Sequence, residues 1–169
     1  LYTWAGPEIA VATTKAYSTQ LAVVSQLGIY MADQRGTITP EYYAALVAEL
    51  ERLPDKAARV LEEQSEIQHF ASRFFNHNSI FFIGRNLDYA TGMEGSLKLK
   101  EISYIHSEAY ASGELKHGTI SLIEPGTLVI ALGTYAPLFD KAMSNVVEVK
   151  SRGASVLALT TESGKEQMA

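Results

Sequence analysis

Charged side chains recur at helical spacing in one stretch of this sequence. Glu94, Lys98 and Glu101 are four and three residues apart, so a helix places them on one face. At 100° per residue they share a sector with the apolar Met93 and Leu97, and we expect this sector to face the core. Two interpretations stay open. The charges form a surface ion pair, or they border a cleft or subunit interface where a carboxylate acts as a general base.

A histidine lies in a short segment between two glycines. His117 follows Glu101 by 16 residues, and Gly113 and Gly118 flank its segment. Glycines on both sides indicate an unusual backbone path, and histidine exchanges protons near neutral pH. His117 is therefore a candidate acid–base group, with a surface histidine of no special role as the alternative. Because the histidines lack metal-ligand spacing and the chain has no cysteine, we predict no metal site.

Hydroxyl groups precede the first expected helix. Thr13 and Thr14 follow Val11 and Ala12, directly before an apolar repeat of helical period. The free N–H groups at a helix N-terminus can bind an anion, so a phosphate or sugar could bind there. Simple N-capping by these hydroxyls is the more common arrangement.

Alternating helices and strands must position these groups. Short apolar runs predict buried parallel strands, and helices are expected between them, so we predict an α/β fold in three layers, a parallel sheet with helices on both faces. Ligands of such sheets bind beyond the carboxyl ends of the strands, here after Ile83, Leu132 and Leu159. The expected strands are residues 80–83, 128–132 and 156–159, and the expected helices are 13–36, 41–75 with a break at Pro54, 88–105 and 137–152.

The composition excludes several classes of protein. The chain has 169 residues, 47% of them hydrophobic, and a net charge of −5, which argues against wholesale disorder and against a nucleic-acid partner. No apolar run is long enough to span a membrane, so we expect no membrane partner. The chain opens at Leu1 without a methionine or signal peptide. We therefore expect a fragment of a longer, cytoplasmic protein.

Three long strings resemble signatures of the glucosamine-6-phosphate synthase family, whose members are also called glutamine–fructose-6-phosphate transaminase (isomerizing). These strings are Glu8–Ala16, Leu97–His106 and Glu108–Gly118. The resemblance implies a C-terminally truncated sugar-isomerase (SIS) fold. Residues 1–38 would end a first SIS lobe, 39–71 would be connecting helices, and 72–169 would form most of a second lobe.

The resemblance also implies a reaction and its partners. The family converts fructose 6-phosphate, a small sugar phosphate, and glutamine into glucosamine 6-phosphate and glutamate, in amino-sugar biosynthesis, and we expect no cofactor. A glutaminase domain of the same parent chain supplies ammonia, and the enzyme is a homodimer.

Residue by residue, Glu101 matches the base that moves a proton between C1 and C2, and Lys98 matches a lysine near those carbons. His117 matches a histidine that assists ring opening and reaches into the neighbouring subunit's site. The remaining matches line the sugar pocket, and they are Val11, Ala12 and Thr13.

The resemblance also implies that parts of the family's site lie outside this chain. The phosphate-binding loop would precede Leu1, and a lysine that forms a Schiff base with the sugar would follow Ala169. We therefore expect the isolated chain to be inactive. The alternatives are another SIS enzyme (a fructosamine 6-phosphate deglycase or a sugar-phosphate isomerase), a non-catalytic phosphosugar-sensing SIS module, or a structural fragment whose charged face only makes a dimer contact.

Overall fold

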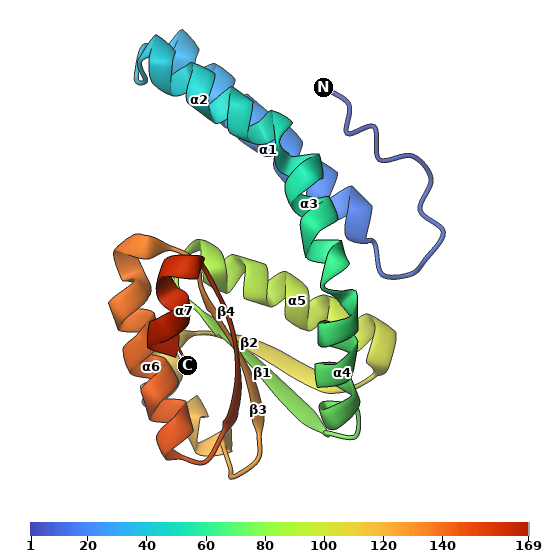
Figure 1. Cartoon of the computed structure of the whole chain (residues 1–169), viewed down its shortest axis with the longest axis vertical. Helices are drawn as coiled ribbons and strands as arrows, with labels where there is room; N and C mark the ends of the chain where they lie inside the picture. Colours follow the sequence, from blue (N-terminus) through green and yellow to red (C-terminus); the bar gives the residue numbers. More distant parts are fainter. Residues whose placement is uncertain (169) are drawn as a thin grey trace. The chain divides into compact units, whose positions relative to one another are not determined.

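The computed structural model describes residues 1–168. It divides into two compact units, Leu1–Arg73 and a second that begins at Phe74 (Figure 1). The finer division into residues 1–38, 39–71 and 72–169 stays a proposal.

The first unit is a coil followed by helices. The predicted helix before Gly36 is α1 (Thr14–Gln34). The predicted long helix consists of three pieces, α2 (Pro40–Glu51), α3 (Leu53–Glu62) and α4 (Gln64–Phe74). The first break falls just before Pro54, because proline fits the first turn of a helix. The second, at Glu63, has no proline or glycine to mark it. Among the described residues of α1–α4 none is buried, so these helices enclose no core of their own.

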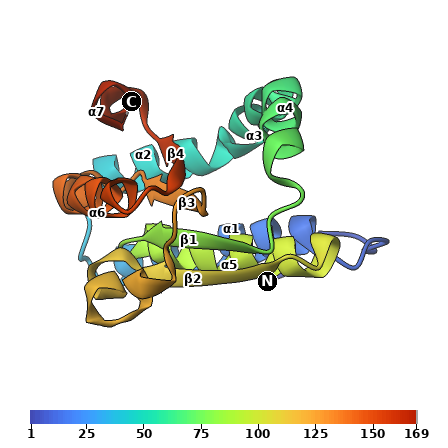
Figure 2. The ribbon, with the colours of Figure 1, turned by 90° about the horizontal axis from the view of Figure 1, so that it is seen from below.

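The second unit is built on a parallel sheet of β1 (Ser79–Gly84), β2 (His106–Ala111), β3 (Leu128–Gly133) and β4 (Ser155–Thr160). The strand order is β2-β1-β3-β4, as Figure 2 shows. The three predicted strands are confirmed as β1, β3 and β4. The strand β2 was not predicted. It lies at the sheet edge and carries His106 and Glu108, so it lacks the wholly apolar pattern of a central strand.

Helices cover both faces of this sheet, as predicted for a three-layer fold (Figure 1). One face carries α5 (Leu87–Ser103), and the other carries α6 (Phe139–Ser151) and a short α7 (Glu162–Met168) that was not predicted. Alternate strand residues separate the layers. Phe82 faces α5, whereas Phe81 and Ile83 join Val146 and Val149 in the main core. The 3₁₀ helices are η1 (Ser112–His117), η2 (Thr119–Leu122) and η3 (Ala136–Leu138).

The expected core-facing side of α5 is wrong. The buried residues of α5 are Asp88, Gly92 and Ser96, on the side opposite the apolar sector. A Cβ on Gly95 would lie 2.9 Å from the Phe82 ring, so small residues bring the helix backbone close to the sheet. The buried Ser107 hydroxyl donates to Ser96 at 2.9 Å. The apolar sector is instead exposed, by 43–65% at Leu87, Met93, Leu97 and Ile102 and by 93% at Tyr104.

Candidate functional site

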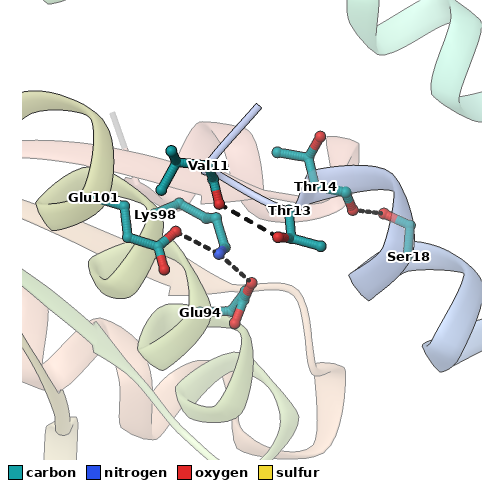
Figure 3. Close-up of polar contacts among 7 residues, drawn as sticks. All are labelled: Val11, Thr13, Thr14, Ser18, Glu94, Lys98 and Glu101. Carbon is teal, nitrogen blue, oxygen red and sulfur yellow. Dashed lines mark hydrogen bonds and ion pairs between the residues drawn. The ribbon is translucent and has the colours of Figure 1, made fainter. Parts of the chain in front are cut away.

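The charged residues of α5 form one ion-paired cluster. Lys98 lies between two carboxylates (Figure 3), 2.6 Å from Oε2 of Glu101 and 3.5 Å from Oε1 of Glu94. The three side chains are 19–28% exposed. The hydrogen bond to Glu101 raises the pKa of Lys98 above its usual value, although desolvation acts in the opposite direction. The ammonium therefore stays charged and holds the Glu101 carboxylate in one orientation.

This cluster lies on the C-terminal half of α5. The helix ends where Tyr104 adopts a left-handed conformation, with φ at 60°, and the chain then enters β2. Since α5 returns from the carboxyl end of β1 to the start of β2, Glu101 lies near the amino ends of the strands. From the sequence we had expected ligands to bind at the opposite edge of the sheet, beyond the carboxyl ends of the strands.

At that opposite edge, the carboxylate of Asp88 joins the start of α5 to the residues that follow β3. Asp88, which is 5% exposed, accepts hydrogen bonds from the backbone N–H groups of Thr134 and Tyr135 at 2.9 and 3.1 Å. It also accepts one from the Thr134 hydroxyl at 2.5 Å. Sequence analysis missed Asp88, although an aspartate in the first turn of a helix after a buried strand is a recognisable signal.

His117 is the last residue of η1, which begins at the carboxyl end of β2. Its side chain is 76% exposed, and its Nε2 is 3.8 Å from the Glu114 carboxylate. The strand β2, about 17 Å long at its six residues, separates the start of η1 from the end of α5. Within one chain, the start of η1 and the end of α5 therefore lie at opposite ends of β2.

The predicted sugar-pocket residues belong to the first unit. Val11 is 83% exposed, and Ala12 and Thr13 are half-buried. Thr13 is the N-cap residue of α1, but its side chain makes no capping bond. Its hydroxyl instead donates to the Val11 carbonyl at 3.3 Å, as Figure 3 shows. The N–H group of Thr14, the first residue of α1, donates to the Ala12 carbonyl at 2.9 Å, so this end of the helix is capped by backbone and not by the Thr13 hydroxyl.

Residues 1–168 contain no group of three or more His, Cys, Asp or Glu side chains placed to hold a metal ion. In the same part of the chain, no helix combines the length and the apolar character that a membrane crossing requires.

Comparison with known proteins places this geometry among related chains. A glutamine–fructose-6-phosphate aminotransferase (isomerizing) from Clostridium acetobutylicum is 54% identical over 165 residues, covering 98% of this chain and 27% of the relative. The enzyme of the same name from Caldanaerobacter subterraneus is 55% identical over 162 residues, covering 96% of this chain and 27% of the relative. The chain thus spans about a quarter of the length of these curated relatives.

Solved structures agree in fold. The C-terminal domain of glucosamine-fructose-6-phosphate aminotransferase from Francisella tularensis superposes with a TM-score of 0.94 at 36% identity, over 97% of this chain and 46% of that one. A Silicibacter pomeroyi protein, provisionally described as a phosphosugar isomerase, gives 0.77 at 28% identity, over 95% of this chain and 46% of that one.

The family model described as SIS domain matches residues 73–166. This range holds the whole sheet, the helices α5 and α6 on its two faces and the charged cluster on α5, and it is more than half of the chain. The chain therefore belongs to the SIS domain family.

Proposed function

We propose that this chain is part of the isomerase region of a glutamine–fructose-6-phosphate aminotransferase. The parent enzyme would convert fructose 6-phosphate and glutamine into glucosamine 6-phosphate and glutamate. The observation that carries this proposal is the similarity over 98% of the chain to a relative of that name. The ion pair of Lys98 and Glu101 at 2.6 Å adds a chemical reason, because it supplies an oriented carboxylate beside a fixed positive charge.

The proposed roles follow the order of the reaction. His117 assists opening of the sugar ring, and ammonia adds to the C2 carbonyl with loss of water to form an imine. Glu101 then takes a proton from C1 and returns it to C2, while the C1 hydroxyl becomes the aldehyde and passes its proton to the nitrogen. Lys98 orients Glu101 near these carbons. The backbone of Val11, Ala12 and Thr13 and the hydroxyl of Thr13 line the sugar pocket.

A homodimer is part of this proposal. The segments that carry Glu101 and His117 join opposite ends of β2, so in this proposal a site that needs both groups takes one of them from each of two copies. The exposed apolar sector of α5 beside the charged cluster supports an interface there. A glutaminase domain elsewhere in the parent chain would supply the ammonia, and a cytoplasmic location would give access to phosphorylated sugars.

The test is Glu101→Gln in the full-length parent, with glucosamine 6-phosphate and glutamate measured separately. We expect sugar amination to fall about 100-fold or more, as for the loss of a general base, while glutamine hydrolysis continues. Glu124→Gln is the matched control, since Glu124 is an exposed glutamate of the same unit. Unchanged amination in the Glu101 variant would refute the assignment. The isolated 169-residue chain should form no glucosamine 6-phosphate.

A phosphosugar isomerase that uses no ammonia is the second candidate, because the Silicibacter pomeroyi structure shares the fold at 28% identity. The same assay separates the two. The isomerase would interconvert sugar phosphates without glutamine or ammonia and would yield no amino sugar.

A further inference from the structure

A chain of polar contacts ties the η1 segment to α6. Lys116, the residue before His117, places its Nζ 2.6 Å from Oε1 of Glu148. The other oxygen of Glu148 accepts a hydrogen bond from the Asn145 amide at 3.1 Å. Desolvation raises the pKa of Glu148, but the bonds and charges of Lys116 and its neighbours outweigh it and lower the net pKa. Glu148 is therefore a charged anchor for the residue beside His117.

The same series of polar contacts continues from Asn145 to the beginning of η1. The Arg85 guanidinium donates to Oδ1 of Asn145 through Nε and Nη2, at 3.2 and 2.8 Å, and Asn145 is 4% exposed. Arg85 lies against Gly113, where an added Cβ would be 3.0 Å from Nη2. Gly113, the second residue of η1, therefore leaves room for the close approach of the guanidinium.

The side chain of His117 makes few contacts that could fix its position. Its side chain is 76% exposed, and Glu114, at 3.8 Å, is 72% exposed, so this contact is weak. The backbone of the segment therefore sets the position of the imidazole. Leu115, with no exposed surface, anchors that backbone from the apolar side, and the Lys116–Glu148 pair anchors it from the polar side.

We propose that Glu148, Asn145 and Arg85 are positioning residues, which hold the η1 segment so that His117 reaches the sugar ring. This inference rests on the proposed function, because it assigns these residues to the ring-opening step. None of them touches the substrate in this proposal. They act through the contact with Lys116 and through the packing of Arg85 on Gly113.

The experiment compares two substrates of the full-length parent carrying Glu148→Gln. Fructose 6-phosphate must be opened first, whereas 5-deoxyfructose 6-phosphate lacks the hydroxyl that closes the ring and is always open. Loss of a charged hydrogen-bond partner predicts a fall of about tenfold in kcat/KM with fructose 6-phosphate. With the open-chain substrate we expect a change of less than about twofold, and Glu124→Gln should change neither.

Two further variants complete the test. Lys116→Met breaks the same ion pair from its 61% exposed side, so it reports on the pair even if Glu148→Gln fails to fold. Adding Glu148→Gln or Lys116→Met to His117→Ala should cause no further loss, since positioning has no effect without the imidazole.

The outcomes separate the inference from the function. Three outcomes would overturn the positioning role alone. They are equal losses of kcat/KM on both substrates, losses that add to that of His117→Ala, and full activity of Glu148→Gln and Lys116→Met when His117→Ala is inactive. Full activity of His117→Ala with fructose 6-phosphate would overturn both that role and the ring-opening assignment.

Discussion

Replacing Asp88 tests how much stability comes from the buried carboxylate that joins the start of α5 to the residues after β3. Asp88→Ala removes the acceptor of two backbone N–H groups and one hydroxyl. A buried donor left without its partner destabilises a protein by about 1–3 kcal/mol. Since Thr134 is exposed and water can reach part of this loop, we expect a total loss of about 3 kcal/mol rather than the sum of the upper values.

Asp88→Asn is the matched comparison. One oxygen of the asparagine can still accept both backbone N–H bonds, which Oδ2 of Asp88 accepts now, and its amide can donate to the Thr134 hydroxyl. Only the contribution of the charge is lost, so we expect about 1 kcal/mol. At about 2–4 °C per kcal/mol for a chain of this size, the alanine variant should melt about 6–12 °C lower than the unmodified chain and the asparagine variant about 2–4 °C lower.

Thermal and urea unfolding followed by far-ultraviolet circular dichroism measures both changes. Tryptophan fluorescence would not report on unfolding of the second unit, because the chain has a single tryptophan, Trp4, and it belongs to the first unit. Amide hydrogen exchange at Tyr135 should accelerate in the alanine variant and much less in the asparagine variant. Equal destabilisation by the two substitutions, or none by either, would refute the reasoning.

Two further predictions concern backbone contacts and the dimer. Gly84→Ala should lower the free energy of unfolding by about 2–3 kcal/mol, because a Cβ there would lie 2.6 Å from the backbone of Asp88. Gly28→Ala, in an exposed part of α1 with nothing within 4 Å, should raise the free energy of unfolding by about 0.5–1 kcal/mol. Urea unfolding measures both changes, and equal changes in the two variants would contradict this prediction. If each site takes Glu101 and His117 from different copies, mixing full-length Glu101→Gln and His117→Ala variants should restore about a quarter of the activity in exchanged dimers; an inactive mixture rules out a site shared between copies.

Part of the fold was predictable because the residues of some strands and helices form a recognisable local pattern. The runs Ile80–Ile83 and Leu128–Leu132 are apolar on both faces, as a central parallel strand requires, and the structure has β1 and β3 there. The strand β2 has no such signature, because it carries His106, Ser107 and Glu108 in place of an apolar run. Its place depends on pairing with β1, which connects Ser79 with His106, and no local pattern contains that information.

The candidate site was predictable at the level of pairs and not of orientation. The spacing of Glu94, Lys98 and Glu101 correctly indicated side chains within reach of one another. The predicted direction of that face was wrong, because Gly92 and Gly95 let the opposite face of the helix approach the Phe82 side chain closely. Burial of a helix on a sheet depends on how near the two backbones come, and small residues decide that distance.

The helix α5 joins two distant points of the second unit as a stiff rod. Asp88 fastens its beginning to the loop after β3, and Glu101 lies 13 residues further along, about 20 Å at the rise of an α-helix. The Phe82 ring against Gly95 leaves the rod little room to slide or roll. A displacement of the helix at Asp88 would therefore also move the Glu101 carboxylate at its other end. A substitution of Asp88 would in this way change the orientation of Glu101 without any direct contact between the two residues.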